Sequence, residues 1–199
     1  AFGSITDINP GAGLLTANAA ILSAGGAIGA TGASNAINTS VATMTATATP
    51  GGVFLNETNA LTLTATANGP GSDVEVDAGG TITVVNVSAP DFVRLDAAGV
   101  GSDLIASAAG TVVSAATATL DATDTIGVSA LSPLGTDVSN MAATAGGDIF
   151  ISNARTLALT ALNSTGGDIS LVGLGGLTTP AVAVTAGGGQ LTIDVVGDL

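Results

Sequence analysis

Short stretches of alternating apolar and polar residues, each closed by a glycine-rich turn, run through most of the chain. The alternation is clearest at Leu61-Thr62-Leu63-Thr64 and at Ile82-Thr83-Val84. A period of two is typical of a β-strand, because successive side chains point to opposite faces. Thr also fits the outer surface of a pleated strand. The pattern therefore predicts strands with branched apolar side chains inside and Thr outside.

One phrase returns late in the chain with a period of about 20 residues. Its copies are Gly146-Gly147-Asp148-Ile149, Gly166-Gly167-Asp168-Ile169 and the looser Gly188-Gly189-Gln190-Leu191. Each copy is followed by a second apolar pair, so one repeat holds two strands and a turn. Such a repeat is typical of a solenoid. We therefore expect an all-β parallel solenoid with coils of about 20 residues.

The recurrence of these copies suggests structural roles for their turn residues. The Gly-Gly pairs at Gly146, Gly166 and Gly188, with their following glycines Gly147, Gly167 and Gly189, are expected to supply positive φ angles. Asp148 and Asp168 are expected to accept hydrogen bonds from backbone N–H groups of the turn. A ladder of aspartates that binds ions is the alternative.

The pattern divides the chain into two parts. Residues 51–199 carry the solenoid coils, whereas residues 1–50 are expected to form an N-terminal capping or donor segment of irregular coils. Within residues 1–50, the segment from Leu14 to Ser23 predicts a short helix, a capping turn or an initial coil. Residues 193–199 resemble a strand cut off in mid-pattern, which indicates a fragment or a subunit that continues into its neighbour. An antiparallel β-sandwich or jelly-roll fibre subunit is the alternative, because turn signals recur about every 8–12 residues.

Composition excludes several classes of function. The chain has 2 Lys+Arg against 15 Asp+Glu and a formal net charge of −13, which argues against binding to nucleic acid. The sequence contains no apolar run of about 18 residues, the length that would predict a membrane-spanning helix. Cys, His, Trp and Tyr are absent, and both cations are Arg. Since the usual bases and nucleophiles are missing, we expect no enzymatic activity, with a carboxylate pair as the remaining option.

Three carboxylates with strand spacing form the candidate metal site. In Asp73-Val74-Glu75-Val76-Asp77, the acidic residues would line one face of a strand while the two valines enter the core. Hard cations such as Ca²⁺ prefer oxygen ligands and would offset the repulsion between like charges. Asp73, Glu75 and Asp77 therefore predict a Ca²⁺ site, and a solvated acidic face is the alternative.

Threonines with the same spacing suggest a binding face. Thr43, Thr45, Thr47 and Thr49 would share one side of a strand, and Thr62, Thr64 and Thr66 echo them. A flat array of this kind resembles ice-binding faces of β-solenoids. Ordinary outward Thr is the interpretation favoured by the sequence, because Thr-x-Thr does not recur once per coil at a fixed register.

The repeated pattern G-G-[DT]-I-x-[IVL] followed by [AT]-L-x-L-T-A carries a resemblance to a known family. Over residues 51–199 the chain resembles the filamentous-haemagglutinin-like exoproteins and related β-strand-repeat surface adhesins of bacteria. The resemblance implies a right-handed parallel β-helix in a secreted, elongated protein at the cell surface, and it carries over no catalytic residue.

These observations together predict a non-enzymatic, extracellular structural protein. Its mechanism would be end-to-end strand stacking between copies of itself, as a fibre, sheath or adhesin segment. The alternative is a surface binding module, either a Ca²⁺-stabilised adhesin or a Thr-rich face for ice or for a cell-surface glycan.

Overall fold

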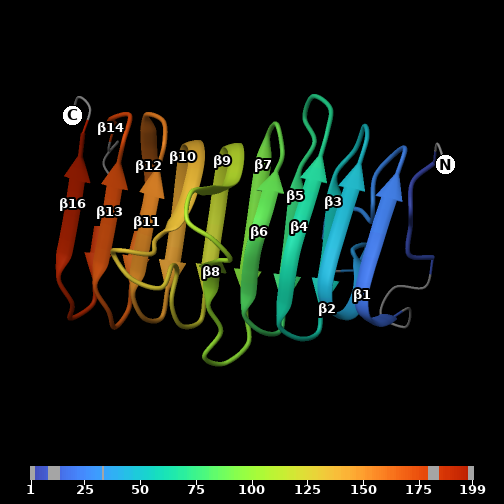
Figure 1. The fold of residues 1–199 in the computed structure, drawn as a ribbon, viewed down its shortest axis with the longest axis horizontal. Helices are drawn as coiled ribbons and strands as arrows, with labels where there is room; N and C mark the ends of the chain where they lie inside the picture. Colours follow the sequence, from blue (N-terminus) through green and yellow to red (C-terminus); the bar gives the residue numbers. More distant parts are fainter. Residues whose placement is uncertain (1–2, 9–13, 33, 179–183, 197–199) are drawn as a thin grey trace.

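The chain winds into a parallel β-solenoid of about 8 turns with roughly 22 residues per coil (Figure 1). The computed structural model describes residues 3–8, 14–32, 34–178 and 184–196, and it shows no helix among them. This architecture confirms the all-β parallel solenoid. The antiparallel alternative is wrong, because every pairing between the named strands is parallel, as for β3 with β5 and β4 with β6.

Within the described residues, sixteen strands build the coils. They are β1 (Leu15–Ala24), β2 (Ile37–Ala48), β3 (Val53–Glu57), β4 (Leu61–Ala67), β5 (Val74–Ala78), β6 (Ile82–Ser88), β7 (Phe92–Ala97), β8 (Leu104–Ala106), β9 (Thr111–Ala122), β10 (Leu134–Ala145), β11 (Ile149–Asn153), β12 (Leu157–Ser164), β13 (Ile169–Gly173), β14 (Leu177–Thr178), β15 (Val184–Ala186) and β16 (Leu191–Val195).

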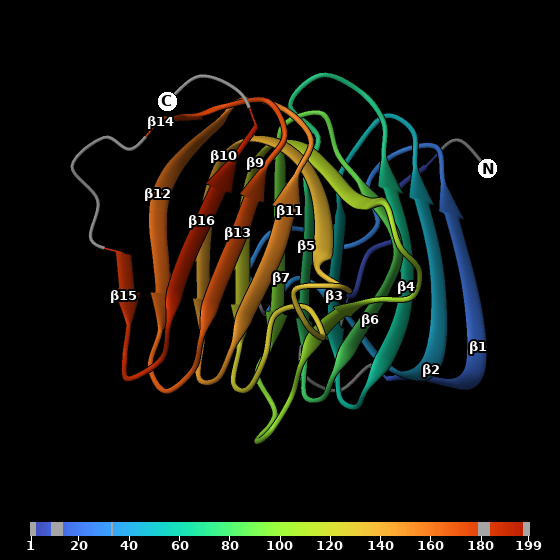
Figure 2. The same cartoon turned by 60° about the vertical axis from the view of Figure 1, so that its left-hand side comes forward.

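The strands form two stacks that enclose the interior (Figure 2). On one side β3, β5, β7 and β9 pair in turn, and on the other β1, β2, β4, β6 and β8 do so. The longer strands pass around a corner and pair on both sides. In β10, for example, residues 134–136 pair with β11 while residues 140–145 pair with β12. These bends join the two stacks into one sheet.

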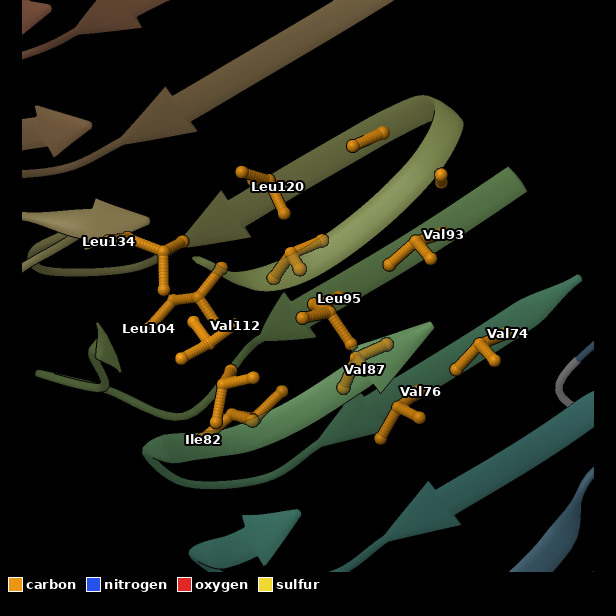
Figure 3. Packing of buried hydrophobic residues seen from close by; sticks show 14 of the residues in the cluster. Val74, Val76, Ile82, Val87, Val93, Leu95, Leu104, Val112, Leu120 and Leu134 are labelled. Carbon is orange, nitrogen blue, oxygen red and sulfur yellow. The ribbon is translucent and has the colours of Figure 1, made fainter. Parts of the chain in front are cut away.

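Columns of apolar side chains fill the interior along the rod. One column contains Val53, Val74, Val93 and Ala118, and another contains Leu61, Ile82, Leu104, Ile126, Ile149 and Ile169. All of them are at most 2% exposed. Figure 3 shows Val74, Val76 and Ile82 within this packed interior. Complete burial of such a side chain stabilises the fold by about 1.5–3 kcal/mol.

The described parts of residues 1–50 also contribute strands. Leu14 to Ser23 coincides with β1, so the initial-coil interpretation is right and the helix is wrong. β1 pairs in parallel with β2 from Leu15↔Thr39 to Ala24↔Ala48. Ala24 is buried, as are several inward residues of β2. The parallel stacking therefore begins well before residue 51.

The same local structure occurs twice, in two distant parts of the rod. Gly29 and Gly127 both have positive φ, 71° and 77°, and each directly follows an isoleucine, Ile28 or Ile126, that bridges to the next coil. The strand that starts at that bridge then runs over the glycine, as β3 in the first case and β11 in the second. The two regions therefore share one local architecture in separate coils.

Candidate functional surfaces

Three carboxylates form a column on the outer surface of β5, β7 and β9. Asp77, Asp96 and Asp121 stack in register on consecutive strands. Arg94 lies in the adjacent column, forms an ion pair with Asp77, and donates from Nη2 to Asp96 Oδ2 at 2.8 Å. One guanidinium therefore bridges two rungs of an acidic column.

Burial raises the pKa of several carboxylates on and beside this surface. Desolvation raises the pKa of Asp96, with Arg94 acting in the opposite direction. Desolvation and then the charge of Asp96 raise the pKa of Asp121. Desolvation and then Asp91 raise the pKa of Asp73, whose Oδ1 is buried without a hydrogen-bond partner. The folded state therefore holds protons on these carboxylates more tightly than the unfolded chain does.

The three residues of the candidate metal site have separate partners. Glu75 Oε1 accepts a hydrogen bond from Thr31 Oγ1 at 3.0 Å, and Asp77 pairs with Arg94. Asp73 lies just before β5. Within residues 3–8, 14–32, 34–178 and 184–196, no group of three or more His, Cys, Asp or Glu is placed to hold a metal ion. The positive charge that faces Asp77 in this structure comes from Arg94.

Replacement of Arg94 by Gln tests this arrangement. We expect Arg94→Gln to lower the free energy of unfolding by about 1 kcal/mol at low ionic strength, because half-exposed ion pairs contribute modestly. Added Ca²⁺ should raise the melting temperature of this variant more than that of the wild type, since Asp77 and Asp96 then lack their cation. Thermal melts by circular dichroism with and without Ca²⁺ measure both effects. Equal responses of the two proteins would contradict the role assigned to Arg94.

Mild acidification should stabilise the protein. The raised pKa values of Asp73, Asp96 and Asp121 mean that the folded state binds more protons, so stability increases as pH falls through the folded-state pKa values toward the ordinary value of 3.8. Asp137 acts oppositely, because its hydrogen bond with Arg155 lowers its pKa, but this pair is largely exposed and contributes little.

Melting temperature measured between pH 7 and about pH 4.5 checks this expectation. Wild type should melt at a higher temperature at the acidic end, and Asp121→Asn should flatten the gain. A wild-type melting temperature that falls steadily over this interval would refute the assignment.

The repeated Gly-Gly-Asp phrase forms a corner ladder between coils. Asp148 Oδ1 accepts from the backbone N–H of Asp168, and Asp168 Oδ1 accepts from that of Gln190, each at 2.7 Å. The same arrangement occurs earlier, where Asp103 Oδ1 accepts from the N–H of Thr125 at 3.1 Å. The carboxylates therefore tie each coil to the next one, whereas the sequence suggested bonds within the turn.

The explanation expected for the turn glycines is wrong in most cases. Among Gly146, Gly147, Gly166, Gly167, Gly188 and Gly189, only Gly188 has a positive φ, 138°. Close approach between coils explains the glycine at several of the others. A Cβ on Gly167 would lie 2.6 Å from the backbone nitrogen of Asp148, and one on Gly189 would lie 2.6 Å from that of Asp168. These corners therefore need small residues because the chain passes directly over the previous coil.

Two buried polar side chains clamp neighbouring coils, a feature that sequence reasoning missed. Asn153 is fully buried and bonds in both directions to Val138, accepting from its N–H and donating to its C=O, each at 3.0 Å. It also accepts from Thr136 Oγ1 at 2.9 Å and donates to the Arg155 carbonyl at 2.7 Å.

Glu57 performs the same task in the other copy of the duplicated architecture. Its carboxylate accepts from Thr39 Oγ1 at 2.8 Å, from the Val41 N–H at 2.9 Å and from the Asn59 N–H at 3.1 Å. Glu57 ends β3 as Asn153 ends β11. The recurrence of Thr-x-Val in the preceding coil, at residues 39–41 and 136–138, was the available sequence signal.

The terminal strands expose residues that belong to the core columns. Leu191 and Ile193 of β16 are 47% and 37% exposed, whereas Ile169 and Leu171, their partners in β13, are 1% exposed. At the opposite end, β1 pairs with β2 alone among the described strands. Among the described residues, β1 and β16 are therefore each paired on one side only.

Comparison of the chain with protein-family models, curated proteins and solved structures gives no match. In the described part of the chain, no helix is long and apolar enough to cross a membrane. We therefore infer the function from the surfaces of the rod.

Proposed function

We propose that the chain is a non-enzymatic structural solenoid of an extracellular or cell-surface assembly, such as a fibre, a sheath or an adhesin segment. Copies of the chain join end to end, and the parallel stack continues from one copy into the next. The resemblance to β-strand-repeat adhesins and the repeated coil architecture support this proposal.

The observation that carries the proposal is the position of β1 and β16, each of which pairs on one side only within the described residues. β1 and β16 lie at opposite ends of the rod (Figure 1). They belong to the same stack, which continues from β8 across a bridge at Ile126 to β11, β13 and β16. The stack is parallel throughout, so a second copy can present β1 to β16 by translation along the axis. Two different surfaces then meet, and such a head-to-tail contact propagates without closing.

Burial provides the driving force at this junction. At the junction Leu191 and Ile193 would become buried, as Ile169 and Leu171 already are. The backbone N–H and C=O groups on the outer edge of β16 would form hydrogen bonds with the strand of the next copy. Apolar area removed from water contributes about 25 cal/mol per Å². The negative charge opposes association in a way that salt screens, so assembly should be favoured at higher ionic strength.

Electron microscopy of the purified 199-residue protein tests the proposal. In negative stain, wild type should form rods that lengthen with protein and salt concentration, while Ile193→Lys should remain as short particles. Val100→Lys is the matched control, because Val100 is fully exposed away from both edges and its replacement should leave assembly intact. Discrete wild-type particles under all conditions would refute end-to-end stacking.

A further inference from the structure

The outer surface of β2 and β4 holds six threonines in a regular array, the Thr face. Parallel pairing aligns Thr43 with Thr62, Thr45 with Thr64, and Thr47 with Thr66. Their inward neighbours, such as Met44 and Leu63, are fully buried, so the threonines point outward. Thr-x-Thr keeps one register over these two coils, although it does not recur in every coil.

The surroundings of the Thr face carry no charge. The outward residues on the flanking strands are Ala19, Ile21 and Ser23 of β1 and Thr83, Asn86 and Ser88 of β6, aligned with the Thr face by the same pairing. The chain as a whole has a net charge of −13. Its carboxylate column lies on β5, β7 and β9, in the other stack. An uncharged surface on so acidic a protein fits an uncharged occupant.

The hydroxyl groups of the Thr face are available to that occupant. None of the six donates to or accepts from another group in the described residues. Elsewhere in the rod Thr hydroxyls are engaged with the protein, as at Thr136, Thr156 and Thr160. Each free hydroxyl can both donate and accept a hydrogen bond, and each Thr also offers a methyl group.

Strand geometry fixes the spacing of these groups. Neighbouring strands lie about 4.8 Å apart, and alternate residues along a strand repeat at about 6.7 Å. The backbone of β2 and β4 is held on both sides, by β1 and β6, so little ordering is required on binding. The result is a rigid, neutral, two-dimensional lattice of hydroxyl and methyl groups.

We propose that the Thr face binds ice. Ice is an uncharged solid whose surface repeats in two dimensions with spacings of the same size as those of the Thr face, and its water molecules both donate and accept hydrogen bonds. The methyl groups would lie against the lattice between hydrogen-bonded hydroxyls. This proposal is independent of end-to-end assembly, because the Thr face lies on the side of the rod.

Incorporation of the protein into a slowly growing ice surface tests the proposal. The α-amino group can carry a fluorophore selectively, since the sequence contains no Lys. We expect wild type to enter the ice phase and to inhibit recrystallisation. Thr45→Tyr with Thr64→Tyr should abolish both effects, because two rings on paired positions break the flat lattice. Thr185→Tyr, on an exposed strand position in the other stack, should retain them.

Circular dichroism must show that the variants keep the wild-type β-signal. If the double Tyr variant fails to fold, Thr45→Val provides the second test, because it keeps the β-branched shape and removes one hydroxyl; ice incorporation should fall. Exclusion of wild type from ice would overturn the proposal, and so would equal losses in Thr185→Tyr. Binding to crystalline polysaccharide without ice incorporation would also overturn it and assign the Thr face to a glycan.

Discussion

Replacement of Asn153 by Ala is expected to lower the free energy of unfolding by about 3–5 kcal/mol, because several buried partners lose their hydrogen bonds together. The groups left behind are the Thr136 hydroxyl, both backbone groups of Val138 and the carbonyl of Arg155. Water cannot replace Asn153 without entering the packed interior, where the side chain is 0% exposed. Urea unfolding followed by circular dichroism measures the loss.

Asn163→Ala is the matched control for this experiment. Asn163 is half-buried on the outside of β12, and its replacement should change stability by at most about 0.5 kcal/mol. Asn153→Asp should fall between the two, since it keeps an acceptor for Thr136 and Val138 and loses the amide donor. Similar unfolding midpoints for Asn153→Ala and Asn163→Ala would contradict the clamp.

Gly127→Ala is expected to cost about 3 kcal/mol or more, since a left-handed residue with a Cβ costs about 1–2 kcal/mol before any overlap is counted. Gly127 has a φ of 77°. An added Cβ would also overlap the backbone oxygen of Phe150 and approach its Cβ to 3.0 Å. Because that oxygen belongs to the next coil, relief of the overlap requires the two coils to separate.

Gly101→Ala separates the two contributions. Its φ is 66°, close to that of Gly127, but no atom lies within 4 Å of the added Cβ. It should therefore lose only the conformational part, about 1–2 kcal/mol. Thermal melts of both variants give the comparison. An equal loss at the two positions would show that the approach between coils contributes nothing.

The alternation of apolar and polar residues predicted the strands, and the repeat then predicted their parallel stacking. At Leu61-Thr62-Leu63-Thr64, the side chains lie inside and outside as the period of two requires. The repeat at Gly146 and Gly166 correctly indicated stacked coils, because it positions a strand at the same place in successive turns. Because each coil contacts only its neighbours and all coils share one interior, the residue pattern of a single coil also determines how the coils stack.

Contacts between coils were much harder to predict. The threonines of the Thr face were recognised in the sequence, but their register was not, because coil lengths vary and the pairing of Thr43 with Thr62 sets it. The Ca²⁺ site was proposed from neighbours along one strand, whereas the partner of Asp77 is Arg94 on the next strand. Asn153 resembles an ordinary polar residue at the end of a strand until its partners in the previous coil are known.

End-to-end stacking is the central claim, and cysteine cross-linking tests it most directly, because the sequence contains no cysteine. Ala19 of β1 and Thr192 of β16 occupy outward positions at opposite ends of the same stack. Strands about 4.8 Å apart bring such positions within the Cα separation that a disulfide accepts.

The measurement is the rate of disulfide formation in an equimolar mixture of Ala19→Cys and Thr192→Cys, compared with each variant alone. The proposed head-to-tail junction predicts rapid cross-linking in the mixture, slow cross-linking of either variant alone, and a ladder of oligomers when one chain carries both cysteines. Equally rapid cross-linking of each variant with itself, or no preference for the mixture, would contradict it.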